Sequence, residues 1–174
     1  MTQEELLKIM PYSYRANREK FAAPLTEAML EFNIDTPRRQ AFFLAQVAHE
    51  SGSLQYVCEI ASGGAYEGRM DLGNDEPGDG PKFRGHGLFQ VTGKENHFKA
   101  ADYFGVPRED ICEWLQTPMG ASRSAGWFWA THNMNESADA NDLRKNTLIL
   151  NGGYNGLIDR GQRLTDAKRG LGLT

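Results

Sequence analysis

The chain has few cysteines and no long apolar run, and both absences narrow what the protein can be. Its two cysteines, Cys58 and Cys112, are too few for a disulfide framework, so we expect two reduced, partly buried thiols. No segment of the sequence approaches the ~20 consecutive apolar residues that a membrane-spanning helix needs. We therefore expect no stable insertion into a membrane.

The sequence also lacks a secretory signal and an overall excess of basic charge. Its first ten residues include Glu4 and Glu5 and hold no long apolar core, so we expect synthesis in a cytoplasm and release by another route. The formal net charge of −4 argues against a general nucleic-acid binder. From Arg144 onwards, six bases and two acids give a charge of +4, which suits either contact with an anionic polymer or a solvated basic helix.

Apolar residues recur at helical spacing along most of the chain, so we predict a mainly α fold. Thr2 and Glu5 form a capping-box pattern, and Thr36 followed by Pro37 is typical of a helix start. The predicted helices span residues 2–10, 16–33, 37–51, 94–104, 107–115, 119–132, 139–149 and 157–168.

Residues 61–87 differ from the rest of the chain in composition. They contain eight glycines and two prolines, which predict a long irregular loop. A loop of this length is usually functional or disordered. Residues 88–92, which follow it, are predicted to form a short extended piece, so any sheet is small.

Glu50 is the first candidate for catalysis. The preceding run, residues 41–48, is apolar on nearly every side, which indicates a buried helix that ends at Ser51 and Gly52. At the C-terminal end of such a helix, the loss of water and the helix dipole both disfavour a charged carboxylate. A carboxyl group that stays protonated near neutral pH can act as a general acid. A structural glutamate that hydrogen-bonds a neighbouring loop is the alternative.

Glu59 is a second carboxylate, nine residues after Glu50. At about 100° per residue, the two would lie on opposite sides of one helix, so the chain must leave the helix and bring Glu59 across a cleft. Two carboxylates on different elements, with room for a water molecule between them, are what glycoside hydrolysis uses. Polar side chains that suit holding water and sugar hydroxyl or N-acetyl groups follow at Gln90, Thr92, Asn96 and Asn151.

Several motifs of the chain resemble glycoside hydrolase family 19, the family of plant-type chitinases and of a group of phage and bacterial endolysins. They lie, in order, at residues 42–52, 66–69, 72–74, 83–93, 151–153 and 159–160. The compact length and the absence of a signal peptide resemble the phage endolysin branch most. The resemblance implies a mainly α, lysozyme-like fold with a deep cleft and a long Gly-rich loop insertion. It also implies one catalytic domain over residues 1–174, with no separate wall-binding module, and an inverting reaction without metal or cofactor.

The resemblance assigns roles to individual residues of this chain. Glu50 matches the general acid, Glu59 matches the second carboxylate, and Thr92 stands where the family has a Ser or Thr that helps to hold the attacking water. Substrate-contacting or cleft-shaping positions are matched by His49, Gln90, Asn96, Asn151 and Arg160. Of these, the arginine is also expected to tune the carboxylates electrostatically.

Some positions depart from the family pattern. His86 stands where the family usually has the arginine of a Gly-Arg-Gly motif. Glu95 and His97 stand where plant chitinases tend to have aromatic residues, which argues against a simple chitin cleft. Glu67, in the Gly-rich loop, is an alternative second carboxylate. A turn contact or an ion pair with Arg69 is its structural interpretation.

We predict an endolysin that hydrolyses the β-1,4 bonds of bacterial peptidoglycan by an inverting acid–base mechanism. A chitinase of the same family is the first alternative. A non-catalytic glycan-binding protein and a lytic transglycosylase are the others, and neither accounts for the Glu50–Glu59 pair. The expected partners are peptidoglycan strands and no nucleic acid. We expect a monomer in the host cytoplasm that reaches the periplasm and the cell wall through a holin-like pore once the membrane is permeabilised.

Overall fold

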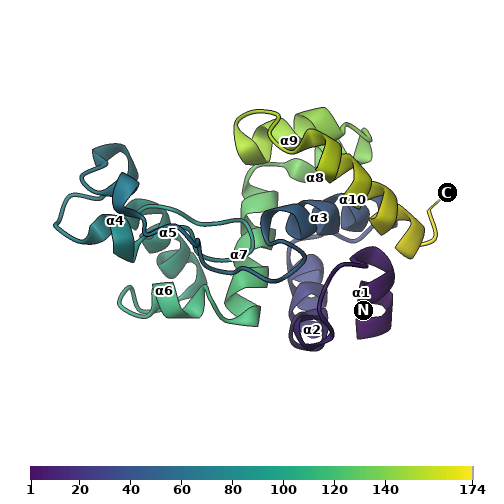
Figure 1. Ribbon diagram of the computed structural model, residues 1–174, viewed down its shortest axis with the longest axis horizontal. Coiled ribbons are helices and arrows are strands. Elements are labelled where there is room, and N and C mark those ends of the chain that lie inside the picture. The colour runs from purple at the N-terminus through teal and green to yellow at the C-terminus, as the bar shows by residue number, and fades with distance from the viewer. Residues whose placement is uncertain (174) are drawn as a thin grey trace.

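A computed structural model describes residues 1–173, and in them the chain folds almost entirely into helices (Figure 1). The elements of this range are α1 (Gln3–Ile9), α2 (Arg15–Glu31), α3 (Pro37–Glu50), η1 (Gly64–Tyr66), η2 (Met70–Leu72), α4 (Asp79–Lys82), α5 (Lys94–Phe104), α6 (Ile111–Trp114), α7 (Pro118–Thr131), α8 (Met134–Asp139), α9 (Leu143–Asn151) and α10 (Leu157–Gly170). Strand-like pairing within residues 1–173 is limited to two isolated bridges, Cys58 with His86 and His86 with Val91. The predicted mainly α fold class is confirmed.

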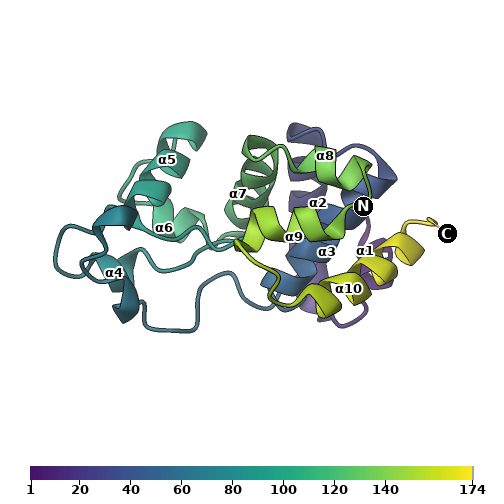
Figure 2. The same ribbon diagram turned by 90° about the horizontal axis from the view of Figure 1, so that it is seen from above.

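The helices form two lobes that lie side by side along the longest axis of the molecule (Figures 1 and 2). The larger lobe holds α1–α3 and α7–α10, with α3 packed against α10 and α2 packed against α7. The smaller lobe holds η1, η2 and α4–α6, and α5 packs against α6 within it. No helix in the described part of the chain has the length and apolar character to cross a membrane.

Helix α3 is the buried centre of the larger lobe. Thr36 caps it by accepting a backbone hydrogen bond from the first turn (3.2 Å), and Pro37 is the first helical residue, as predicted. Every residue from 41 to 48 is buried. The helix ends at Glu50, and the chain then turns away at Gly52, whose φ of +57° favours glycine. The last turn of a buried helix therefore presents Glu50.

The smaller lobe has little apolar core of its own. The buried cluster under α5 and α6 consists of Ala100, Ala101, Ile111 and Leu115. Polar contacts order the Gly-rich segment next to it. Lys94 forms ion pairs with Asp75 (2.7 Å) and Asp79 (3.0 Å), and Asn74 donates to the carbonyl oxygen of Tyr66 (2.8 Å). The segment that the sequence predicted as a long irregular loop is thus ordered mainly by hydrogen bonds and charge.

Two predicted helices differ from the structure. The predicted helix 139–149 is wrong at its start, because Asn141 adopts a left-handed conformation (φ +55°) and Asp142 then caps a new helix, α9, with its side chain. Residue 139 is instead the end of α8, which we did not predict. The predicted helix 107–115 shrinks to α6, because Pro107 begins a turn that precedes it.

The extended piece predicted at 88–92 is wrong as well. The chain turns there, with φ of +84° at Gly87 and +54° at Gln90, and the turn brings Val91 back to pair with His86. A residue other than glycine with positive φ is uncommon and is held there by its surroundings. The fold therefore places the Gln90 side chain by means of a tight turn rather than a strand.

Candidate active site

Glu50, the last residue of α3, is held by a buried arginine from α10. The Glu50 side chain is 22% exposed, whereas that of Arg160 is 1% exposed. Arg160 donates from Nη2 to Glu50 Oε1 (2.5 Å), from Nη1 to Gln46 Oε1 and from Nε to the carbonyl oxygen of Asn155 (3.1 Å). Charge-assisted hydrogen bonds of this kind are short and fix both partners. The structure thus places Arg160, which we expected to tune the carboxylates, directly against Glu50.

A buried polar network lies beside this ion pair. Gln46 donates from Nε2 to Asn146 Oδ1 (2.8 Å), and Asn146 donates from Nδ2 to Ser137 Oγ (2.9 Å). The three residues belong to α3, α9 and α8 and are fully buried. Each buried group left without its partner would cost about 1–3 kcal/mol, so the network favours one arrangement. We did not predict these residues, although Gln46 is the one polar side chain in the apolar run 41–48 and was a usable signal.

His49, next to Glu50, is held by a second cluster of polar side chains, which comes from α10. Its Nδ1 lies 2.6 Å from Asp159 Oδ2, which also accepts a hydrogen bond from Arg163 Nε (2.6 Å). Burial raises the pKa of Asp159, but the hydrogen bonds from Arg163 and His49 outweigh burial, so this pKa is lowered. A Cβ atom at Gly156 would lie 2.2 Å from the His49 ring, so only glycine fits there. His49 therefore joins the end of α3 to α10 and shapes the large-lobe side of the site.

Glu59 lies on the connection that leads from α3 to the smaller lobe, and three contacts hold it. Its Oε2 accepts a hydrogen bond from the N–H of Gly85 (3.0 Å), and its Oε1 accepts one from the Tyr66 hydroxyl (3.2 Å). Its own N–H donates to the Gly85 carbonyl oxygen (2.8 Å). Burial, and then the Glu59 charge, raise the pKa of Tyr66. An ionised carboxylate offers about four acceptor positions, so Glu59 retains capacity to bind a water.

Glu67, the alternative second carboxylate, serves the Gly-rich loop. Its Oε1 and Oε2 accept hydrogen bonds from the N–H groups of Gly78 (2.6 Å) and Gly80 (2.9 Å). Arg69 pairs with the aspartate two residues after it, at 2.6 Å, rather than with Glu67. The turn contact is therefore the structural role of Glu67, and the ion pair is not. Each oxygen of Glu67, like each oxygen of Glu59, accepts one hydrogen bond, so these contacts alone do not choose between the two carboxylates.

Gln90, Thr92 and Asn96 form a hydrogen-bonded row where the chain enters α5. Gln90 Nε2 donates to the Gly87 carbonyl oxygen (2.7 Å), and the Thr92 hydroxyl donates to the Gln90 carbonyl oxygen (3.0 Å). Asn96 Nδ2 donates to the Thr92 carbonyl oxygen (2.8 Å). These bonds use donors of the three side chains, so their oxygens remain available as acceptors for a ligand.

The same three side chains line a pocket of about 340 Å³ between the lobes. Another wall of the pocket comes from the end of α7 and the residue after it. It is formed by Trp127, Phe128, Thr131 and His132. The His132 ring stacks on Phe128, with the two ring centroids 3.9 Å apart. A concave site that combines apolar rings with a few polar groups is typical of ligand binding.

The remaining predicted positions behave differently from one another. Asn151 is the exposed last residue of α9, and Gly152 after it is left-handed (φ +70°), so the Asn151 amide stands at a turn on the larger lobe. Glu95 is exposed and pairs with Lys99 (2.7 Å). His97 is fully buried, so it does not contact a ligand in the cleft. The argument against a chitin cleft that we drew from His97 is therefore wrong.

Comparison with known proteins identifies a bacterial relative of nearly equal length. No family model matches the chain. A glycosyl hydrolase family 19 domain-containing protein of Haemophilus influenzae is 28% identical over an alignment 186 positions long, which covers 88% of each chain. An endochitinase of Arabidopsis thaliana is 36% identical over 93 residues, which cover 53% of this chain and 32% of that protein. The bacterial similarity thus extends over most of the chain.

The fold is similar to those of solved chitinases. Chitinase C from Streptomyces griseus has a TM-score of 0.77 and 21% identity, covering 99% of this chain and 77% of that chain. The family GH19, class IV chitinase from Zea mays has a TM-score of 0.71 and 21% identity, covering 95% of this chain and 85% of that chain. These structures share the fold, and the Haemophilus protein is similar in sequence over most of its length. Sequence similarity and fold both relate the chain to glycoside hydrolase family 19, and they support a chitinase-like glycoside hydrolase.

Proposed function

We propose that this protein is an endolysin that cleaves the β-1,4 glycosidic bonds of bacterial peptidoglycan with inversion at the anomeric carbon. The observation that carries the proposal is a pair of carboxylates held by separate networks. Arg160 holds Glu50 on the larger lobe, while Gly85 and Tyr66 hold Glu59 on the way to the smaller lobe. Inverting glycosidases use two carboxyl groups with a water between them. Glycan binding alone needs no such pair.

Glu50 is the proposed general acid. Arg160 binds its Oε1, which leaves Oε2 to carry the proton to the leaving oxygen. The guanidinium also stabilises the carboxylate that forms when the proton leaves, because a charge-assisted hydrogen bond is stronger than a neutral one. Gln46 accepts from the same guanidinium and so keeps it in place.

Glu59 and Thr92 are proposed to direct the attacking water. The Thr92 hydroxyl donates to the Gln90 carbonyl oxygen, so its own oxygen is free to accept a hydrogen bond from that water. The water adds to the anomeric carbon as the glycosidic C–O bond breaks. Its proton passes to Glu59, while the proton of Glu50 passes to the leaving oxygen. Exchange with solvent then restores both carboxyl groups.

The choice of polymer is the finer part of the proposal. The resemblance to the endolysin branch is what favours a bacterial wall as the substrate, while the relative that covers 88% of each chain is described only as a family 19 domain protein. Chitin is the second candidate, because the plant relative and the solved structures of similar fold are chitinases. Both polymers carry N-acetyl and hydroxyl groups, which the acceptor oxygens of Gln90, Thr92 and Asn96 suit.

Product analysis on two purified polymers tests the proposal. The protein is incubated with peptidoglycan sacculi and with chitin oligomers, and the soluble products are identified by mass spectrometry. We expect peptidoglycan fragments with one added water per cleaved bond, and NMR of fresh products should show inversion. Anhydro products would indicate a lytic transglycosylase, and cleavage of chitin alone would indicate a chitinase. No product from either, with the protein folded, would indicate a glycan-binding protein.

We also propose that the enzyme acts as a monomer and reaches the wall from the cytoplasm through a holin-like pore. Peptidoglycan lies outside the membrane that encloses the cytoplasm, so expression alone should let cells grow. Culture turbidity before and after membrane permeabilisation tests this, with prompt lysis expected only afterwards. Lysis on expression alone would contradict the proposed route, and size-exclusion chromatography tests the monomer.

A further inference from the structure

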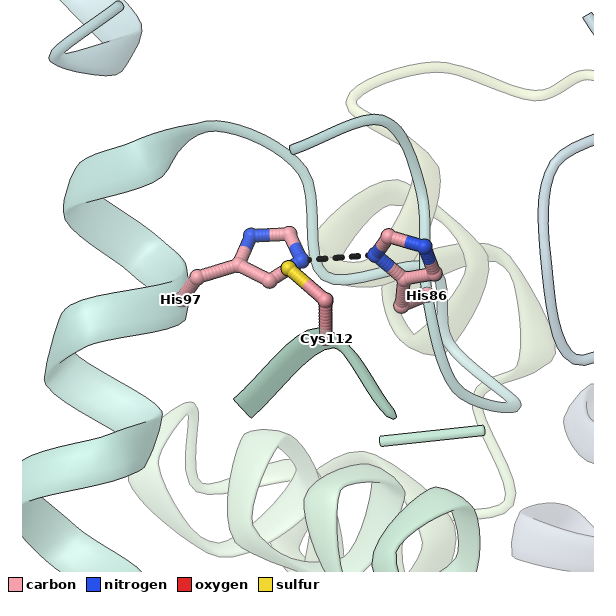
Figure 3. Close-up of side chains that lie close together, drawn as sticks. All are labelled: His86, His97 and Cys112. Carbon is pink, nitrogen blue, oxygen red and sulfur yellow. Dashed lines mark hydrogen bonds between the residues drawn. The ribbon is translucent and has the colours of Figure 1, made fainter. Parts of the chain in front are cut away.

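His86, His97 and Cys112 gather inside the smaller lobe (Figure 3). They come from three pieces of chain: the loop after α4, helix α5 and helix α6. One ligand atom from each residue lies within 4.8 Å of the other two. Both histidines are buried and Cys112 is half-buried. We propose that these three side chains bind a zinc ion.

The hydrogen bonds around His97 direct a lone pair toward the cluster. Its Nδ1 lies 2.8 Å from the carbonyl oxygen of Gly93, which can only accept, so Nδ1 carries the proton. In the neutral ring, Nε2 therefore holds a lone pair, and it lies 2.8 Å from His86 Nδ1. Metal-bound histidines commonly donate their other ring N–H to a backbone carbonyl in this way. His97 is already in the tautomer that a metal ion requires.

The donor set and its spacing suit zinc. Imidazole nitrogen binds zinc at about 2.0–2.1 Å and thiolate sulfur at about 2.3 Å, so tetrahedral ligand atoms lie roughly 3.3–3.8 Å apart. The observed separations run from 2.8 Å, between the two histidines, up to a limit of 4.8 Å. Small rotations of the side chains complete the site. Binding releases the thiol proton of Cys112 to solvent and transfers the His86 proton from Nδ1 to Nε2 through solvent.

Cys58 stands beside the cluster. It pairs with His86 in an antiparallel bridge, and residues directly opposite each other in such a bridge have their side chains on the same face. Cys58 is half-buried as well. The fourth position on the ion is filled either by this thiol or by water, and both arrangements occur at zinc sites. The proposal requires only the three residues of the cluster.

A hydrogen-bonded pair of neutral histidines is the alternative for this cluster. The two rings meet edge to face with centroids 5.1 Å apart, and Phe83 covers His97 with ring centroids 5.2 Å apart. This packing accounts for His86 and His97, but it does not require a thiol beside them. A metal site gives all three side chains one role.

A bound ion would crosslink the lobe that has the smaller core. It would join α5, α6 and the loop after α4, and small domains gain most from such a crosslink. His86 follows Gly85, whose N–H and carbonyl oxygen both bond to Glu59. The same ion would therefore steady the loop that positions the second carboxylate. From the sequence we expected no metal, because the resemblance to family 19 implies a metal-free reaction. Spacings of 11 and 15 residues between the three ligands also match no common zinc motif.

Zinc titration of the metal-free protein tests the proposal without an activity assay. The full chain is treated with a chelator and a thiol reductant, dialysed, and titrated with Zn²⁺ by calorimetry. We expect one equivalent to bind, and Tm to rise by roughly 5–10 °C at a hundredfold excess of Zn²⁺ over Kd. Co²⁺ in place of zinc is expected to show the absorption of a thiolate-bound tetrahedral ion. A folded protein that binds neither ion, with no shift in Tm, would overturn the proposal.

Single-residue variants distinguish the proposed zinc ligands from Cys58, which lies beside them. Cys112→Ser is expected to abolish the sulfur-to-cobalt absorption band if water fills the fourth position, and to reduce it by about half if Cys58 does. His97→Gln is expected to lose the zinc-dependent rise in Tm. Cys58→Ser is the matched control and should still bind one equivalent of metal. Circular dichroism checks that each variant is folded, and the cobalt spectrum of the unaltered protein decides the proposal if one is not. A band that survives in Cys112→Ser but disappears in Cys58→Ser would overturn the assignment.

Discussion

The larger lobe and the smaller lobe are stabilised by different kinds of contact. In the larger lobe, Phe43 of α3 meets Trp129 and Phe89 edge to face, with ring centroids 5.5 and 5.7 Å apart, inside a continuous apolar core. In the smaller lobe the buried apolar cluster is small, and Lys94 and Glu67 bind the Gly-rich segment through charge and hydrogen bonds. Packing therefore orders the larger lobe, whereas polar contacts order much of the smaller one.

This difference extends to the two carboxylates. Glu50 ends a buried helix and bonds to a buried arginine, so the packing of α3 on α10 sets its position. Glu59 lies on irregular chain and takes its position from the Gly85 N–H and the Tyr66 hydroxyl. Regions with few buried apolar contacts open more readily than packed helices. We therefore expect changes around the two carboxylates to affect stability and turnover in different proportions.

Glu50→Gln should give the largest effect, because it removes the proton donor from the more rigid side. General acid catalysis typically contributes ~10²–10⁴-fold, so we expect hydrolysis to fall by that factor. The fold should persist, since the glutamine carbonyl can still accept the hydrogen bond of Arg160. Release of soluble fragments from the polymer measures the rate, and activity above a tenth of the parent value would contradict the assignment.

Arg160→Leu tests whether the larger lobe depends on its buried ion pair. Removing one partner of a buried pair costs about 3–5 kcal/mol, and we expect about 3 kcal/mol because Glu50 retains contact with solvent. The free energy of unfolding in urea measures this loss. Arg15→Leu is the matched control, because its pair with Glu19 is exposed and should contribute little. Equal losses in the two variants would show that burial of the pair is unimportant.

Glu59→Gln and Glu67→Gln form a matched pair on the less rigid side. We expect Glu59→Gln to lower turnover by about 10²-fold, because it removes the proton acceptor. Its Tm should change little, because the amide oxygen can accept from the Gly85 N–H while the amide nitrogen donates to the Tyr66 hydroxyl. Glu67→Gln should lower Tm and largely retain turnover, because an amide oxygen can replace only one of the two oxygens that bind Gly78 and Gly80. Steady-state rates and melting curves of both variants measure these effects. The reverse pattern would move the second carboxylate into the Gly-rich loop.

The pH dependence of stability tests the burial of the two histidines in the smaller lobe. In the metal-free protein, burial lowers the pKa of His86 and that of His97 to about 4, from an ordinary value of 6.5. The unfolded chain binds protons as the pH falls below 6.5, while the folded protein does not until about 4, so stability falls as the pH is lowered through this window. One histidine contributes at most ~1.4 kcal/mol per pH unit.

Urea midpoints near neutral pH and near pH 5.5, measured with a chelator present, test this dependence. The interval from neutral pH to pH 5.5 lies above the ordinary pKa values of carboxyl groups, so most of the change should come from histidine. His97→Gln should show a shallower slope than the parent protein. A parent protein equally stable at both pH values would contradict the burial of neutral histidines.

Local signals in the sequence predicted much of the helical framework. The capping box of Thr2 and Glu5 is present, and α3 and α5 begin and end within one residue of the predicted 37–51 and 94–104. Caps and apolar spacing act over a few residues, so a single sequence can reveal them. The boundary at Asn141 was missed, although asparagine adopts the left-handed conformation more readily than most residues other than glycine and was a usable signal for a helix end.

The buried helix that ends at Glu50 and the carboxyl groups that follow it were determined by the sequence itself, since they depend on residue type and local spacing. Only the tertiary structure decided that Arg160 reaches Glu50 from 110 residues away. Only the tertiary structure, likewise, brought His86, His97 and Cys112 to one point. Contacts between distant residues depend on which helices pack together and at what angle, and a local pattern fixes the apolar face of a helix but not the partner that covers it.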